Sequence, residues 1–180
     1  MVEDKILVGI LMGSDSDLKV MSQTIKVLEF FEIRHEIIIT SAHKTLKKTI
    51  DYAQTAQDRG IEIIICGAGL SAALPGVVSS QTFLPVIGVP LSNEKSCLNG
   101  VDALYSIMQM PPGIPVATMS IGELGAKNAG LLTIQILALK YPVIYPELKK
   151  YRDRLTNELE GKNEKLNELG YEKYLEKHSK

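Results

Sequence analysis

The chain has 180 residues, of which 45% are hydrophobic and 23% are charged, and its formal net charge is −1. This length fits one ordinary domain with a sizeable core, and the near-neutral charge gives no reason to expect nucleic acid or an anionic membrane as a partner. No apolar run reaches the length of about 18 residues that a membrane span needs, and MVEDK at the start leads into no secretory signal pattern. We therefore expect a cytoplasmic protein.

Short apolar runs alternate with segments of helical character along the first 140 residues. Unbroken apolar runs are typical of strands that are buried on both faces, as in a parallel sheet, and they occur at residues 5–12, 36–40, 61–66, 85–90 and 115–119. Helices are expected between and after them, at residues 18–31, up to 59, 71–82, 100–110 and 125–138. This alternation predicts an α/β fold, with a parallel sheet and helices on both of its faces.

The last forty residues differ in composition from the rest. They are rich in charge, with an apolar stripe at Leu148, Tyr151, Leu155, Leu159, Leu166 and Leu169, which predicts one or two amphipathic helices. We expect residues 1–140 to form the α/β domain and residues 141–180 to be a C-terminal helical extension of it. The extension would pack on the body or on a neighbouring subunit.

Three polar or small-residue clusters follow the first three predicted strands. They are GSDSD at residues 13–17, SAHKT at residues 41–45 and CGAGLSAALPG at residues 66–76. Because ligands bind at the carboxyl ends of the strands in open α/β sheets, we expect the three clusters to meet at one edge. The third cluster has no charge, no aromatic ring and nothing larger than leucine, so its backbone can approach a ligand closely.

Two of these clusters contain groups with useful chemistry. Ser14 and Ser16 precede a helix N-terminus, which can hold a phosphate, although serine and aspartate are equally the preferred capping residues. His43 is the one histidine of three that is expected at this edge, and histidine exchanges protons near neutral pH. Lys44 adds a cation that can pair with phosphate or carboxylate.

Several other kinds of site are not supported. The chain has no P-loop, GxGxxG, GxSxG or HExxH pattern. Cys66 and Cys97 are far apart and form no CxxC pair, so we expect two reduced thiols rather than a disulfide or a zinc site. A receiver-like or other non-catalytic nucleotide-binding module remains a distant alternative, and it predicts that His43 is dispensable.

Six motifs, in order, resemble those of the PurE family of purine biosynthesis: GSDSD, SAHKT, GAGLSAALPG, PVIGVPL, SIMQMPPGIPVATMSIG and GAKNAGLL. The resemblance covers residues 5–140. It implies a three-layer α/β/α flavodoxin-like fold and a homo-oligomer, commonly an octamer. It also implies aminoimidazole ribonucleotide (AIR) or its carboxylated forms as substrate and 4-carboxyaminoimidazole ribonucleotide as product. CO2 would be a co-substrate, with no metal or organic cofactor.

The resemblance also implies a role for each matching residue. His43 would transfer the proton at C4 of the imidazole ring. The implied substrate-binding residues are Gly13, Ser14, Ser16, Asp17, Ser41, Ala42, Lys44, Ala68, Gly69, Leu70, Ser71 and Leu74. By this resemblance Ser14, Ser16 and Asp17 would hold phosphate and ribose. Ser41 and Lys44 would contact phosphate, and residues 69–71 would line the base pocket.

The family has a mutase branch and a class II carboxylase branch, which differ in two motifs. The mutase pattern is SAHRTP followed by GAGGAAHLPG, and the carboxylase pattern is SAHK followed by AGRSNALSG. Lys44, Ser71 and Ala73 agree with the carboxylase, and Ala73 stands where the mutase has a second histidine. The SIMQMPPG loop is closer to the mutase, and three positions of the glycine-rich segment depart from the carboxylase. We expect direct carboxylation of AIR by CO2, with the mutase reaction as the alternative.

Overall fold

The computed structural model describes residues 5–92 and 96–178, and its core is one five-stranded parallel sheet. The strands lie in the order β2-β1-β3-β4-β5. Their bounds are β1 Val8–Met12, β2 His35–Ile39, β3 Ile63–Gly69, β4 Val86–Leu91 and β5 Ala117–Thr118. This is the flavodoxin-like strand order, and the chain reverses its direction of winding between β1 and β3.

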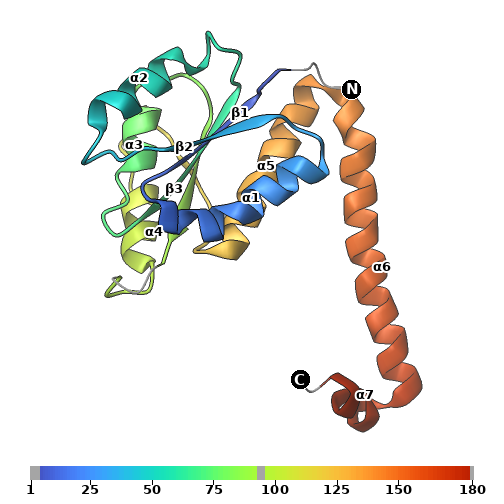
Figure 1. The fold of residues 1–180 in the computed structure, drawn as a ribbon. Coiled ribbons are helices and arrows are strands. Elements are labelled where there is room, and N and C mark those ends of the chain that lie inside the picture. The colour runs from blue at the N-terminus through green and yellow to red at the C-terminus, as the bar shows by residue number, and fades with distance from the viewer. Residues whose placement is uncertain (1–4, 93–95, 179–180) are drawn as a thin grey trace.

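Helices cover both faces of the sheet, as Figure 1 shows. The helices are α1 Leu18–Phe30, α2 Leu46–Ala56, α3 Leu74–Ser79, α4 Val101–Met108, α5 Glu123–Lys140, α6 Tyr145–Leu169 and α7 Tyr171–His178, with short 3-10 helices η1 Asp15–Asp17 and η2 Pro142–Ile144. Helices α1 and α5 lie on one face, and α2, α3 and α4 lie on the other. The predicted three-layer α/β/α fold is confirmed.

The unbroken apolar runs have a direct structural cause. In β1, Val8, Ile10 and Met12 belong to the core cluster beneath α1 and α5, whereas Leu11 belongs to the cluster beneath α2, α3 and α4. Since successive side chains of a strand point to opposite faces, a central strand with helices on both faces buries every residue. All five residues of β1 are buried.

The glycine-rich segment is folded differently from the prediction at its start and its end. Strand β3 continues through Gly69, because Ala68 and Gly69 pair with Pro90 and Leu91 of β4. The following helix, expected at residues 71–82, is only Leu74–Ser79. Positive φ angles at Leu70 and Ala72 prevent an earlier start, because an L-residue in that region cannot continue a right-handed helix.

The fifth strand is also shorter than the predicted span of residues 115–119. It is an edge strand that pairs only with β4, through Ala117 and Thr118. Pro115 has no backbone N–H to donate to a ladder, and its carbonyl accepts a hydrogen bond of 2.7 Å from Ser79 Oγ instead. The first residue of the predicted strand therefore joins α3 to the loop before β5 instead of pairing in the sheet.

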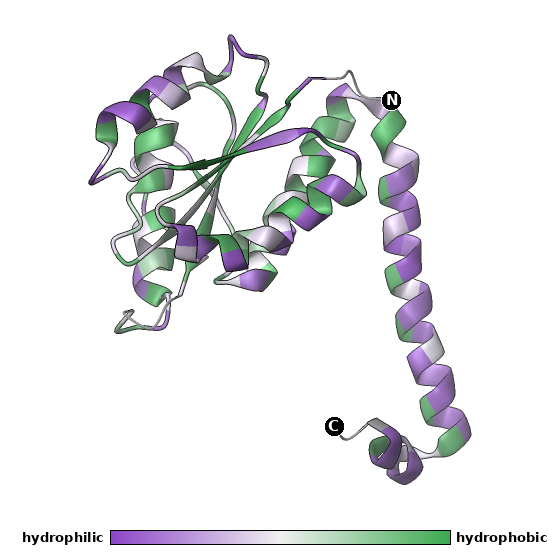
Figure 2. Cartoon of the chain, in the orientation of Figure 1, coloured by the Kyte–Doolittle hydropathy of each residue, from purple (hydrophilic) through white to green (hydrophobic). Residues whose placement is uncertain are grey.

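The C-terminal extension is helical and amphipathic, as predicted, but only its first turns pack on the body. Leu148 and Tyr151 are buried, and the Tyr151 ring centroid lies 5.8 Å from those of both Phe30 and Phe31. Beyond them α6 projects away from the sheet (Figure 1) as a polar helix with a narrow apolar stripe (Figure 2). No helix in the described part of the chain is both long and apolar enough to cross a membrane.

Candidate active site

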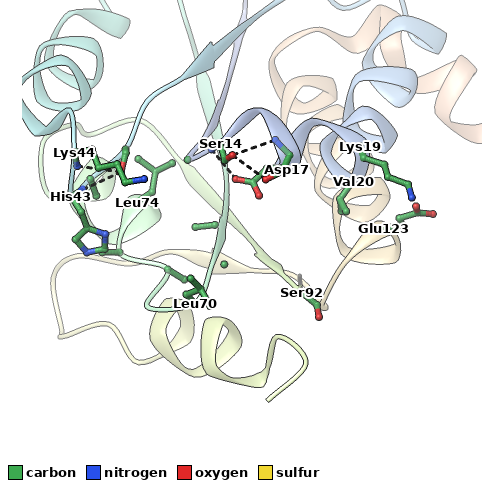
Figure 3. Close-up of a pocket in the computed structure, with 18 residues that line it drawn as sticks. Ser14, Asp17, Lys19, Val20, His43, Lys44, Leu70, Leu74, Ser92 and Glu123 are labelled. Carbon is green, nitrogen blue, oxygen red and sulfur yellow. Dashed lines mark hydrogen bonds between the residues drawn. The ribbon is translucent and has the colours of Figure 1, made fainter. Parts of the chain in front are cut away.

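A pocket with a volume of about 730 Å³ lies at the carboxyl ends of β1, β2 and β3. It is the site that the edge argument predicts, at the switch point between β1 and β3. All but one of the predicted site residues line it: Gly13, Ser14, Ser16, Asp17, Ser41, Ala42, His43, Lys44, Ala68, Gly69, Leu70 and Leu74. Figure 3 shows His43 and Lys44 on one side of the pocket and Lys19 and Glu123 on the other, with Ser14 and Asp17 between them.

The exception is Ser71. It is exposed and does not line the pocket. Its backbone carbonyl turns toward α4 and accepts a hydrogen bond from Ser106 Oγ. Of the three residues that were expected to line a base pocket, only Gly69 and Leu70 line the pocket of this structure.

The GSDSD segment forms a capping box. The Ser14 N–H donates to Asp17 Oδ2 at 3.0 Å, and Ser14 Oγ accepts from the Ser16 N–H at 3.3 Å. Ser16 Oγ in turn donates to Ser14 Oγ at 2.9 Å. The capping role is thus present, and it uses backbone donors that a phosphate would otherwise share. The Ser14 hydroxyl also donates within the segment, to Asp15 Oδ1 at 3.0 Å, so a bound phosphate would take over donors from this network.

Burial of Asp17 affects its ionisation. Desolvation raises the pKa of this carboxyl above its ordinary value, although the backbone hydrogen bonds from Ser14 and Gly13 oppose the shift. The negative charge of neighbouring Asp15 raises the pKa further. The Asp17 carboxyl can accept hydrogen bonds from the hydroxyl groups of a ligand.

The SAHKT segment presents His43 and Lys44 from a rigid turn. Ser41 Oγ accepts hydrogen bonds of 3.3 Å from the backbone N–H groups of both residues. The Ser41 N–H donates to Thr45 Oγ1 at 2.8 Å, and the Thr45 N–H donates to the Ser41 carbonyl at 2.9 Å. This closed network fixes the backbone and leaves the Ser41 hydroxyl proton available for a ligand.

The side chains of His43 and Lys44 are both exposed at the pocket. Within residues 5–92 and 96–178, the imidazole makes no hydrogen bond and the ammonium group no ion pair. An ammonium group and an imidazole that make no such contacts with the described residues are both available to a bound molecule. Together with the hydroxyls opposite, they suit a phosphorylated ligand whose reaction includes a proton transfer.

The third wall of the pocket consists of small and apolar residues. Ala68, Gly69, Leu70, Ala72, Ala73 and Leu74 contribute to it. Beneath it Cys66 is fully buried, and this burial raises the pKa of its thiol, which therefore stays protonated and is a poor nucleophile. Both cysteines are free, as predicted, and Cys97 is exposed.

The structure adds pocket residues that the sequence interpretation did not assign. They are Lys19, Val20, Ala72, Ala73, Ser92 and Glu123. Ser92 directly follows β4, and Glu123 begins the helix after β5. The rule that placed the first three clusters at the carboxyl edge applies equally to these two, and it would have found them.

Comparison with known proteins identifies the family. The model of the AIR carboxylase family matches residues 7–158 of the chain. The chain belongs to the AIR carboxylase family. Membership confirms the resemblance inferred from the six motifs, and the family match extends past residue 140 into α6.

Relatives within the AIR carboxylase family carry two different names. A protein of Pyrococcus abyssi named N5-carboxyaminoimidazole ribonucleotide mutase is 56% identical over 169 residues, which are 94% of this chain and 95% of that protein. A protein of Candida glabrata named phosphoribosylaminoimidazole carboxylase is 47% identical over 172 residues, which are 96% of this chain but 30% of the longer fungal protein. The crystal structure of Treponema denticola PurE superposes with a TM-score of 0.80 at 32% identity, covering 90% of this chain and 99% of that one.

Proposed function

We propose that this protein makes 4-carboxyaminoimidazole ribonucleotide for purine biosynthesis. One observation carries the proposal: His43, Lys44 and the small-residue wall, from separate segments of the chain, line the same pocket as the serines of GSDSD. The serines, Ser41 and Lys44 would hold the ribose phosphate. The small residues from Ala68 to Leu74 would leave room for the imidazole ring and CO2.

The reaction that we propose needs a nucleophilic ring and a base. The electron pair of the AIR enamine forms a bond from C4 to the carbon of CO2, and one C=O electron pair of CO2 moves onto oxygen to give a carboxylate. C4 is then tetrahedral and still carries its hydrogen. His43 removes that proton, the C–H electron pair returns to the ring, and the ring regains its aromatic form.

The ring itself supplies the nucleophile, so we propose no metal or organic cofactor for this chemistry. CO2 is small, uncharged and weakly polar, and few groups can hold it. Its reaction depends on being confined beside C4 in a site with little water. A wall of alanine, glycine and leucine side chains is suited to such confinement.

Two versions of this activity are candidates. We favour direct carboxylation by CO2, because Ala73 lines the pocket where the mutase pattern has a histidine, and because Lys44 replaces the mutase arginine. The mutase reaction, in which the carboxylate moves from the exocyclic nitrogen to C4, is the second candidate. It is favoured by the names of the relatives from Pyrococcus abyssi and Pyrococcus horikoshii, at 56% and 51% identity.

The two candidates predict different substrates. The purified protein should convert AIR to the 4-carboxylated product when bicarbonate and carbonic anhydrase supply CO2, at a rate that rises with the CO2 concentration. In a separate reaction the protein receives the N-carboxylated ribonucleotide without added bicarbonate. Product formation is followed by its ultraviolet absorbance and by chromatography that separates it from the N-carboxylated isomer, which has the same mass.

Turnover of the N-carboxylated form alone would overturn direct carboxylation and establish the mutase reaction. An added CO2 scavenger separates the two further, because it removes free CO2 that forms when the N-carboxylated compound decays in solution. If neither compound is turned over, both versions of the proposed activity are wrong. Boiled enzyme provides the rate of the uncatalysed decay.

We also propose a cytoplasmic homo-oligomer, and an octamer by family resemblance. Leu155, Leu159 and Leu166 leave an apolar stripe on α6 with exposed fractions of 44%, 69% and 37%, and Phe83 is fully exposed at the opposite end of the sheet from the pocket. Light scattering should therefore give a mass several times 19.8 kDa. Leu159→Lys should lower that mass if the stripe is an interface, and a monomeric wild-type protein would exclude the assembly.

A further inference from the structure

The loop that joins β3 to α3 has an unusual backbone. Leu70 and Ala72 have φ angles of 57° and 35°, a region that residues with a Cβ atom rarely occupy. The Ala72 N–H donates to the Gly69 carbonyl at 3.0 Å and closes a tight turn. Conformations of this kind are unfavourable and persist only where surrounding contacts hold them.

Such a contact comes from α4. The Ser106 hydroxyl donates a hydrogen bond to the carbonyl of Ser71, the residue between the two strained positions. Among the described residues, it is the one side-chain hydrogen bond from another element to the loop of residues 69–73. Figure 3 shows Leu70 at the edge of the pocket nearest α4.

Helix α4 is a firm support for this hydrogen bond. Ala103 and Ile107 are buried in the core, with exposed fractions of 0% and 1%. Ile107 is the direct neighbour of Ser106, and its Cγ2 packs so closely over Gly88 of β4 that a Cβ built there would lie 2.5 Å away. The position of the Ser106 backbone is therefore set by the sheet.

The hydrogen bond also determines the orientation of a whole peptide group. The carbonyl of Ser71 and the N–H of Ala72 belong to one planar unit and point in opposite directions. Holding the carbonyl toward α4 directs the N–H back to Gly69, and this keeps the turn closed. The same turn places Leu70, Ala72 and Ala73 on the pocket wall.

We propose that Ser106 is a positioning residue for catalysis, whose hydroxyl holds the β3–α3 loop in the conformation that lines the active-site pocket. Ser106 itself is exposed on α4 and does not line the pocket. It acts on the reaction through Ser71 and the wall that confines CO2 beside C4. This role rests on the proposed function, because it assigns that wall to the ring and CO2.

The test compares Ser106→Ala, Ser106→Thr and a matched control in the purified full-length protein. Ser22→Ala is the control, because Ser22 Oγ makes a similar hydrogen bond to the Lys19 carbonyl, at 2.8 Å, on the exposed surface of α1. Three quantities are measured: kcat and KM with AIR and bicarbonate, the melting temperature, and amide hydrogen exchange of the peptide containing residues 68–74.

In the Ser106→Ala protein the loop amides should exchange faster than in wild type. Its kcat/KM should be about tenfold lower, mainly because kcat falls, as expected when one hydrogen bond that sets the position of the loop is removed. Ser106→Thr retains the hydroxyl and should stay within about threefold of wild type. Ser22→Ala should match wild type in both activity and loop exchange.

Unchanged loop exchange and activity in Ser106→Ala would overturn the proposal. A loss that Ser106→Thr shares, with an equal fall in melting temperature, would also overturn it, because it would show a structural role of the side chain alone. Hydrogen exchange does not depend on the substrate. If the wild-type protein turned over neither ribonucleotide, the proposed function would fail, while exchange would still show whether Ser106 holds the loop.

Discussion

Replacing His43 with asparagine should lower kcat by a factor of about 10²–10⁴, the usual contribution of a positioned acid or base. Asparagine is close to histidine in size and can hydrogen-bond, but it cannot take the proton from the tetrahedral C4. The imidazole makes no hydrogen bond with the described residues that folding would lose. Substrate affinity, measured by titration calorimetry with AIR, and the melting temperature should therefore stay near their wild-type values.

His35→Asn is the matched control for this prediction. His35 lies at the start of β2, at the opposite end of that strand from the SAHKT turn, and its Nδ1 is 3.0 Å from the Ile33 carbonyl. Its replacement should leave kcat within about twofold of wild type, the scale of most surface substitutions. A His43→Asn protein that retains more than a third of wild-type kcat would exclude His43 as the proton-transfer group, and another group would have to take the proton from C4.

The edge of the sheet that carries the site could be predicted from sequence because it depends on a repeated local signal. Each of GSDSD, SAHKT and the glycine-rich segment follows a run of apolar residues, and parallel strands bring their carboxyl ends together. Hydrophobic burial on both faces makes those runs conspicuous. The same signal was available after β4 and β5, where Ser92 and Glu123 reach the pocket.

The conformation of the glycine-rich segment could not be predicted in the same way. Nothing in the local sequence indicates that Leu70 has a φ of 57°, because leucine rarely adopts that conformation. The mutase pattern has a glycine at this position, which would adopt it freely. Contacts from α4, about 35 residues away, hold the turn, and they become visible only when the chain is folded.

The length of α6 that packs on the body could not be predicted from the sequence either. The leucine stripe predicts a helix with one apolar face, but a stripe does not identify what covers it. The aromatic group of Phe30, Phe31 and Tyr151, with the Arg154 guanidinium 5.2 Å from the Tyr151 ring centroid, holds the first turns against α1. Leu159 lies beyond that group and is exposed.

The largest loss of stability should follow from Gly125→Ala, at the start of α5. A Cβ atom built on Gly125 would lie 1.6 Å from the carbonyl oxygen of Ser120 and 2.6 Å from its carbonyl carbon. Both are backbone atoms, so no side-chain rotation relieves the contact. We expect the free energy of unfolding to fall by about 3 kcal/mol or more and the melting temperature, measured by calorimetry, to fall by about 10 °C.

The segment around Gly125 cannot move aside without loss elsewhere. The Gly122 N–H donates to the Pro90 carbonyl of β4 at 2.9 Å, and Thr24 Oγ1 of α1 donates to the Ala126 carbonyl at 2.6 Å. Ala126 is fully buried. A shift of α5 would therefore break hydrogen bonds to the sheet and to α1 and would also open the core between them.

Gly161→Ala tests whether the loss comes from crowding rather than from alanine itself. Gly161 lies within α6 with no atom within 4 Å of a Cβ built on it, so alanine there should stabilise the helix by up to about 1 kcal/mol. The two variants make the same chemical change. Gly125→Ala should lower the melting temperature, whereas Gly161→Ala should raise it or leave it unchanged. A wild-type melting temperature for Gly125→Ala would show that α5 can shift freely, against the close packing of its first turn.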